Sequence, residues 1–268
     1  MKNTIGFFGG GNMGRAIMGG LIKSKLYKAE EIFVYDVYAP TLEKLQNELG
    51  IKPVNRNKEL VENAQTLIIS VKPVVLPTVL KEIKEDISKD KIVISIAAGV
   101  TVNKLEELLS PQHKIVRVMP NTPALVGEGM SAIAVNEHLS QEEQEKVLAI
   151  FSSFGKGQIV SEKLIDAVVG VSGSSPAYVY MFIEALADGA VLEGMPRNMA
   201  YEFAAQAVLG SAKMVLETGK HPGELKDMVC SPGGTTMAAV KVLEEKGFRS
   251  AVIDTVHAAT EKNRNMGV

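Results

Sequence analysis

The chain has 268 residues, enough for one large or two modest domains at about 150 residues per domain. Hydrophobic residues make up 46% and charged residues 22%, a balance that excludes a largely disordered chain. With 29 Lys and Arg against 31 Asp and Glu, the formal net charge is -2. This charge gives no support to a nucleic-acid or membrane-surface partner.

Other classes of protein are disfavoured by single features. The longest apolar stretch, residues 92–100, is far shorter than the roughly 18 residues of a membrane span, so no membrane partner is expected. The single cysteine, Cys230, cannot form an intramolecular disulfide, which favours a cytoplasmic protein, and the start lacks a signal-peptide core. No histidine has a second Cys or His at ligand spacing, so no metal site is expected.

The first part of the chain alternates β-type runs with helical stretches. The runs are residues 4–8, 31–35, 66–70, 92–96 and 115–119, and helical segments such as 13–25 and 39–48 lie between them. Continuous apolar strands of this kind are buried on both faces of a sheet. The alternation predicts a Rossmann-type α/β domain over residues 1–161, with a doubly wound parallel sheet and right-handed crossovers.

After residue 161 the β-type runs stop and the chain reads as helical. Expected helices cover residues 176–193, 196–218, 223–229, 235–245 and 249–265. Ser175 before Pro176 is typical of a helix start, and Gly194, Gly219 and Gly247 stand where helices end. We therefore expect an all-α domain over residues 162–268. Its first two helices are apolar on more than one face, which suits either a buried central helix or a subunit interface.

A glycine fingerprint follows the first expected strand. Residues 9–14 read Gly-Gly-Gly-Asn-Met-Gly and open the helix that runs to residue 25. In this context Gly9 allows a tight turn, Gly11 lets a pyrophosphate approach the backbone, and Gly14 permits close packing of helix on sheet. The pyrophosphate would bind the helix N-terminus, where unpaired N–H groups and the dipole attract anions. The pattern therefore predicts a dinucleotide cofactor.

Further polar positions follow the later strands. Asp36 ends the second strand, where an acidic residue binds the ribose 2′-hydroxyl of NAD, although it is also suited to capping a turn. Arg56 and Lys58 are placed to meet the 2′-phosphate of NADP instead, so both cofactors stay open. Lys72-Pro73 and Ala97-Ala98 follow the third and fourth strands, where ligands bind in open α/β sheets.

The helical half contains a polar loop before an expected helix. Residues 231–236 read Ser-Pro-Gly-Gly-Thr-Thr, which exposes backbone N–H groups and hydroxyls at a helix start. Such a nest is suited to a small anion, and a carboxylate is the obvious candidate. Residues 172–176 form a second polar helix start, which lines the same cleft or only caps the helix. Cys230 has no His or Lys neighbour to activate it, so we interpret it as a packing residue.

Taken together, these motifs resemble the pyrroline-5-carboxylate reductases over essentially the whole chain. The stretches that carry the resemblance are residues 9–14, 71–73, 97–101, 117–123, 170–178 and, most specifically, 221–236. The resemblance implies a nicotinamide-binding domain, a helical dimerisation domain, and reduction of a cyclic imino acid to L-proline by NADPH or NADH. It also implies a homodimer, with a ring of dimers as the larger assembly.

The family's contacts transfer to matching positions. Cofactor contacts are implied at Gly9, Gly10, Gly11, Asn12, Met13, Gly14, Asp36, Asn57, Val71, Lys72, Pro73, Ala97 and Ala98. Substrate contacts are implied at Glu162, Ser231, Thr235 and Thr236, and the intervening Gly233 and Gly234 belong to the anion nest. The chain departs from the family at Met228, where many members have Asn, and at Ser175, where Gly is usual.

The chemistry agrees with this implication. Reduction of a C=N bond needs a hydride donor near the imine carbon, an anchor for the carboxylate, and a proton for the nitrogen. An imine is easily protonated, so the Thr236 hydroxyl or a bound water is sufficient as the proton source, and Thr236 is the candidate catalytic residue.

Two alternative classes of protein are disfavoured by the sequence. The β-hydroxyacid dehydrogenases place a catalytic Lys and Asn where this chain has Val179 and Ile183, so their base is absent. A cofactor-binding regulator without activity is disfavoured by the intact anion loop, residues 231–236.

Overall fold

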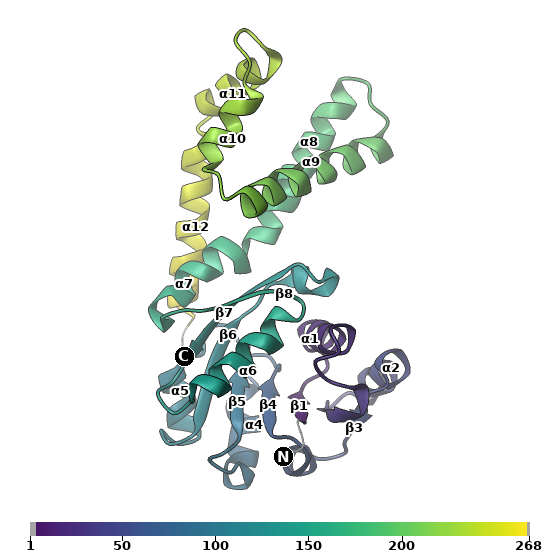
Figure 1. Ribbon diagram of the computed structural model, residues 1–268, viewed down its shortest axis with the longest axis vertical. Helices are drawn as coiled ribbons and strands as arrows, with labels where there is room; N and C mark the ends of the chain where they lie inside the picture. The colour runs from purple at the N-terminus through teal and green to yellow at the C-terminus, as the bar shows by residue number, and fades with distance from the viewer. Residues whose placement is uncertain (1–3, 267–268) are drawn as a thin grey trace. The chain divides into compact units, whose positions relative to one another are not determined.

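The computed structural model describes residues 4–266, which form two compact units. The first unit contains the chain up to Gly173 together with the segment from Ala258 onward, and the second contains Ser174–His257. Figure 1 shows both units and labels most of their helices and strands. The chain therefore returns to its first unit at the end of its last helix.

The first unit is built on a single eight-stranded sheet with the order β3-β2-β1-β4-β5-β6-β7-β8. The strands are β1 (Ile5–Phe8), β2 (Ile32–Tyr35), β3 (Lys52–Pro53), β4 (Thr66–Ile69), β5 (Ile92–Ser95), β6 (Lys114–Met119), β7 (Gly129–Val135) and β8 (Gly155–Ile159). All neighbouring pairs are parallel except β6 and β7. The order reverses between β1 and β4, which is the switch point where open α/β sheets bind ligands. The expected Rossmann-type fold is thus confirmed.

Helices cover both faces of the sheet. Those of this unit are α1 (Asn12–Lys23), α2 (Ala39–Leu49), α3 (Asn57–Asn63), α4 (Leu76–Ile83), α5 (Val102–Leu108), α6 (Gln141–Ser152) and α7 (Ile165–Val168), with short turns η1 (Ala29–Glu31), η2 (Lys84–Asp86), η3 (Thr122–Val126), η4 (Glu162–Leu164) and η5 (Val169–Gly173). One core cluster joins α1, α2 and α6 to the sheet, and a second joins α3, α4 and α5 to it. Burial on both faces explains why the central strands are continuously apolar.

The second unit is helical, as expected. It contains α8 (Ser175–Leu192), α9 (Arg197–Thr218), α10 (Pro222–Val229), α11 (Thr235–Glu245) and most of α12 (Phe248–Arg264). Helices α8 and α9 pack side by side through a small cluster that includes Ala187, Ala200 and Ala204 (Figure 1). Large apolar side chains on the same two helices stay exposed, among them Met181 at 68% and Phe203 at 61%. Such an apolar surface is typical of an interface with another chain.

Three strands were not expected from the sequence. Strand β3 has two residues, and β8 reads Gly-Lys-Gly-Gln-Ile, so neither contains the apolar run on which the other predictions relied. Strand β7 is buried over most of its length, but it runs antiparallel to β6 and extends the sheet beyond the parallel part. The five predicted strands match β1, β2, β4, β5 and β6 to within one residue at either end.

Candidate active site

A cavity of about 300 Å³ lies at the carboxyl ends of β1, β2 and β4. It is lined by Phe8, Gly9, Gly11, Tyr35, Asp36, Val37, Asn57, Ser70, Val71, Lys72, Val75 and Val79. Six of these residues, Gly9, Gly11, Asp36, Asn57, Val71 and Lys72, were predicted to contact the cofactor. The tertiary structure therefore gathers residues from four separate segments around one hollow at the switch point of the sheet.

The glycines of the turn at residues 9–14 are needed for different structural reasons. Gly9 has a φ of +100°, and a Cβ on Gly14 would come within 2.8 Å of the Gly9 carbonyl oxygen. A Cβ on Gly10 would collide with Leu45 at 2.5 Å. At Gly11, by contrast, a Cβ would meet nothing within 4 Å. The fold thus accounts for Gly9, Gly10 and Gly14, whereas Gly11 keeps a space open at the N-terminus of α1.

Ser70 supports this turn from the end of β4, and sequence reasoning missed it. Its hydroxyl lies 2.7 Å from the Gly9 carbonyl oxygen and 3.0 Å from that of Phe8, and it donates to these acceptors. Ser70 also lines the cavity. The signal available in the sequence was a hydroxyl directly after the apolar run of a central strand, at the edge where ligands bind.

Asp36 holds the same turn from the side of β2. Its Oδ2 accepts a hydrogen bond from the Gly10 N–H at 2.8 Å, and its Oδ1 accepts one from the Tyr38 N–H at 2.9 Å. A carboxylate has about four acceptor sites, so each oxygen keeps room for a ribose hydroxyl. The structure gives Asp36 the turn-holding role, and its contact with a ribose stays a prediction.

We expect Asp36→Ala to weaken use of both cofactors and to weaken NADH use more strongly. Both effects follow because the variant loses the support of Gly10, and NADH additionally loses an acceptor for its 2′-hydroxyl. A hydrogen bond to a charged group contributes roughly 1.5 to 3 kcal/mol, so the NADH-to-NADPH ratio of KM should rise about tenfold. Steady-state kinetics with each cofactor measure this ratio. An unchanged ratio would mean that Asp36 only holds the turn.

Asn57 begins α3 at the wall of the cavity. Its amide nitrogen donates to Glu82 Oε2 at 2.6 Å, whereas its Oδ1 is buried and has no hydrogen-bond partner within the described part of the chain. A buried acceptor without a partner is costly unless a ligand supplies a donor. Of the two cations considered for a 2′-phosphate, Lys58 pairs with Asp86 at 2.9 Å, and this contact raises the pKa of Lys58.

The other predicted cofactor residues do not line this cavity. Asn12 and Met13 are the first residues of α1. Gly10 lies in the turn before this helix, and Gly14 lies in its first turn. Pro73 follows Lys72 and is exposed. Ala97 and Ala98 lie in the loop between β5 and α5, where Ala97 is buried and Ala98 half-buried.

The predicted substrate residues fall in both units. Glu162 opens η4 in the first unit, whereas Ser231 to Thr236 belong to the second. Within that loop Gly233 has a φ of +68°, and the Gly234 N–H donates to the Ser231 carbonyl oxygen at 3.0 Å. Gly234 is the N-cap of α11 and no side chain caps the helix, so its first N–H groups are available to an anion. The Thr236 side chain is half-buried, and Ser231 and Thr235 are exposed.

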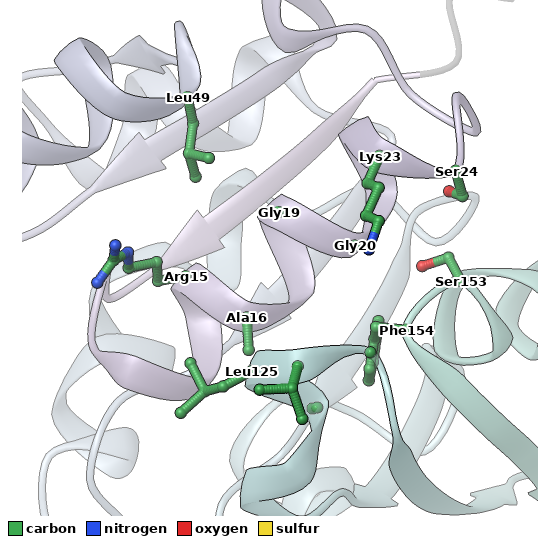
Figure 2. A pocket seen from close by; sticks show the side chains of 13 residues that line it. Arg15, Ala16, Gly19, Gly20, Lys23, Ser24, Leu49, Leu125, Ser153 and Phe154 are labelled. Atoms are coloured by element: carbon green, nitrogen blue, oxygen red, sulfur yellow. The ribbon is translucent and has the colours of Figure 1, made fainter.

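A separate hollow of about 710 Å³ lies beside α1, as Figure 2 shows. Gly19, Gly20 and Lys23 face Leu125 and Phe154 across it, and a Cβ on Gly20 would come within 2.6 Å of the Phe154 side chain. The residues predicted to bind cofactor or substrate all lie elsewhere. Among residues 4–266, no three His, Cys, Asp or Glu side chains are grouped as a metal site would require.

The doubly wound sheet, the glycine turn and the cavity at the switch point define an NAD(P)H-dependent oxidoreductase. Residues 4–99 match the family model described as NADP oxidoreductase, coenzyme F420-dependent, and residues 162–266 match the one described as pyrroline-5-carboxylate reductase dimerisation. The second match assigns the helical part of the chain to homo-oligomerisation. No helix in the part that the structure describes is long and apolar enough to cross a membrane.

Similar proteins narrow the class further. The chain is 53% identical to pyrroline-5-carboxylate reductase of Escherichia coli, with 99% of each sequence covered, and 49% identical to that of Methanosarcina acetivorans, covering 100% of this chain and 99% of the relative. It resembles the solved reductase of Coxiella burnetii with a TM-score of 0.94 at 34% identity, and the NADP-bound one of Plasmodium falciparum with 0.90 at 36%, over 100% of both chains in each case. The chain belongs to the pyrroline-5-carboxylate reductases.

Proposed function

We propose that this chain reduces 1-pyrroline-5-carboxylate to L-proline with NADPH or NADH, the last step of proline biosynthesis. Two features of this one chain carry the proposal. A Cβ on Gly11 would meet nothing within 4 Å, and the helix that follows Gly234 has no side-chain cap. The first suits the pyrophosphate of a dinucleotide, and the second suits the carboxylate of a small substrate.

The cofactor residues have distinct roles in this proposal. The N–H groups at the start of α1, from Asn12 and Met13, bind the pyrophosphate, and Gly11 leaves the space for it. Asp36 and Asn57 bind the adenosine ribose, where the unpartnered Oδ1 of Asn57 accepts a hydrogen bond from a ribose hydroxyl. The reduced nicotinamide, when bound, supplies the hydride for the imine carbon. Val71, Lys72, Pro73, Ala97 and Ala98 border the cofactor at the carboxyl ends of β4 and β5.

The substrate residues hold the imino acid. The backbone N–H groups of Thr235 and Thr236 bind its carboxylate at the start of α11, within the nest formed by Ser231, Gly233 and Gly234. The Thr236 hydroxyl orients or delivers the proton that the ring nitrogen gains as its double bond is reduced. Glu162 contacts the substrate through its carboxylate. Hydride arrives at carbon and a proton at nitrogen, so the reaction is balanced.

The proposal extends to assembly and location. Residues 1–161 bind the dinucleotide, and residues 162–268 form the dimerisation and substrate-binding domain, a division supported by the family model that starts at residue 162. The exposed apolar side chains of α8 and α9 support a homodimer, and a ring of dimers is the larger assembly that we propose. A chain with Cys230 as its single cysteine suits the reducing cytoplasm.

The function is tested by steady-state oxidation of NADPH and of NADH with 1-pyrroline-5-carboxylate. We expect turnover with at least one cofactor, together with formation of L-proline in equal amount. A folded sample that shows no turnover above background with either cofactor would contradict the proposal.

A further inference from the structure

Arg117 is a buried cation that the proposed function does not yet use. It lies in β6 with 5% of its surface exposed. An arginine is almost never buried to this extent unless its charge is paired. The partners of its guanidinium group therefore indicate what the residue is for.

The partners are two carboxylates from the segment that follows β8. Arg117 Nη1 lies 3.0 Å from Glu162 Oε1, and its Nη2 lies 3.9 Å from Asp166 Oδ1. The shorter of these distances is that of a charge-assisted hydrogen bond, whereas the longer is a looser ion pair. Glu162 is thus the principal partner of Arg117.

The contacts of Glu162 are divided unequally between its two oxygens. Oε1 accepts from Arg117 and also from the Val102 N–H at 2.8 Å, at the first residue of α5. Oε2 has no hydrogen-bond partner among residues 4–266, and 34% of the side chain is exposed. The carboxylate is therefore held through one oxygen, while the other is free of protein hydrogen bonds in the described part of the chain.

Asp166 is secured independently of Glu162. Its Oδ1 accepts from Asn263 Nδ2 at 2.7 Å, and its Oδ2 lies 3.8 Å from Arg264 Nε. Asn263 is buried in the last turn of α12, 97 residues further along the chain. Asp166 therefore has a structural partner of its own, and it serves as a matched control for Glu162.

We propose that Arg117 is a positioning residue for substrate binding, which acts by fixing the Glu162 carboxylate. With Oε1 held by Arg117 and Val102, Oε2 is oriented to accept a hydrogen bond from the protonated ring nitrogen of the substrate. This inference rests on the proposed function, because it takes the Glu162 contact with substrate from there. Preorganisation of this kind strengthens substrate binding without touching the cofactor.

The test compares KM for 1-pyrroline-5-carboxylate with KM for NADPH in Arg117→Met, Glu162→Gln and the double variant. We expect Arg117→Met to raise KM for 1-pyrroline-5-carboxylate about tenfold or more, because the charge-assisted contact of Glu162 with the substrate is misplaced. KM for NADPH should change by less than about twofold. In the Glu162→Gln background the same change should add almost nothing, since residues that act through one another are not additive. Arg117→Lys, which keeps the charge but not the fork, should recover part of the loss.

Asp166→Asn is the control, and we expect it to lower Tm while leaving both KM values within about twofold. The inference is overturned if Arg117→Met leaves KM for 1-pyrroline-5-carboxylate unchanged. It is also overturned if Arg117→Met raises this KM as much in the Glu162→Gln variant as in the unmodified chain. Should Arg117→Met not fold, Arg117→Lys takes its place in the same cycle under the same criteria. Turnover by the unmodified chain tests the function separately, and its absence would overturn both.

Discussion

Gly11→Val is expected to abolish turnover with either nicotinamide cofactor while the protein stays folded. Gly11 is the N-cap of α1 with φ -64° and ψ -176°, an extended conformation that valine adopts without strain. Its Cβ would meet nothing within 4 Å in the protein itself. The branched side chain would therefore occupy only the space assigned to the pyrophosphate.

The expected loss of cofactor affinity is about hundredfold or more, because several hydrogen bonds to a charged group, each contributing roughly 1.5 to 3 kcal/mol, are displaced together. Replacing glycine at an N-cap costs at most about 1 kcal/mol, so Tm should fall by only about 2–4 °C. Equilibrium binding of NADPH and a thermal melt measure the two quantities.

Gly19→Val is the matched control, since Gly19 lies in the same helix and its Cβ would also meet nothing within 4 Å. We expect this variant to bind NADPH normally. Normal binding by Gly11→Val, or an equal loss in Gly19→Val, would contradict the assignment of Gly11 to the pyrophosphate.

A mixture of Gly11→Val and Thr236→Ala chains is expected to regain activity that neither parent has. The reason is that we expect the anion loop of one chain to complete the cofactor site of its partner. In each hybrid dimer one site then contains only intact parts and the other contains both lesions, so about half of the normal activity per hybrid returns. Activity is measured after the subunits have exchanged.

The control for this experiment is a chain with both substitutions mixed with equal unmodified chain. If sites are shared, every hybrid is inactive and about a quarter of the activity remains, whereas separate sites leave about half. A mixture of the two single variants that forms hybrids yet stays inactive would exclude the shared site. It would leave the reductase function standing.

The turn at residues 9–14 is a feature that local sequence pattern was sufficient to predict. A glycine fingerprint between an apolar run and a helix predicted both the turn and its position, because φ preferences and helix starts depend on neighbouring residues. The same holds for the loop before α11, where Gly233 and Gly234 precede the helix as expected. The five strands recognised from the sequence belong to the parallel part of the sheet, where apolar runs alternate with helical stretches.

What the tertiary structure decided are the contacts between distant segments. Ser70 reaches the Gly9 carbonyl oxygen, and Asp36 reaches the Gly10 N–H, because parallel strands bring their carboxyl ends to one edge. Local pattern places both side chains at strand ends, but it does not identify the backbone groups to which they bond.

Arg117 gives the clearest case of this division. In the sequence it stands inside an apolar run, and only the fold shows that Glu162 and Asp166 pair with it. Asn263 then joins Asp166 from the last helix, across 97 residues. By itself the sequence determined five of the strands, the helices of the second unit and the turns before α1 and α11, whose causes are local. Which charged side chains are buried, and which of them pair, depends on which surfaces pack together. Only the tertiary structure determined this burial and pairing.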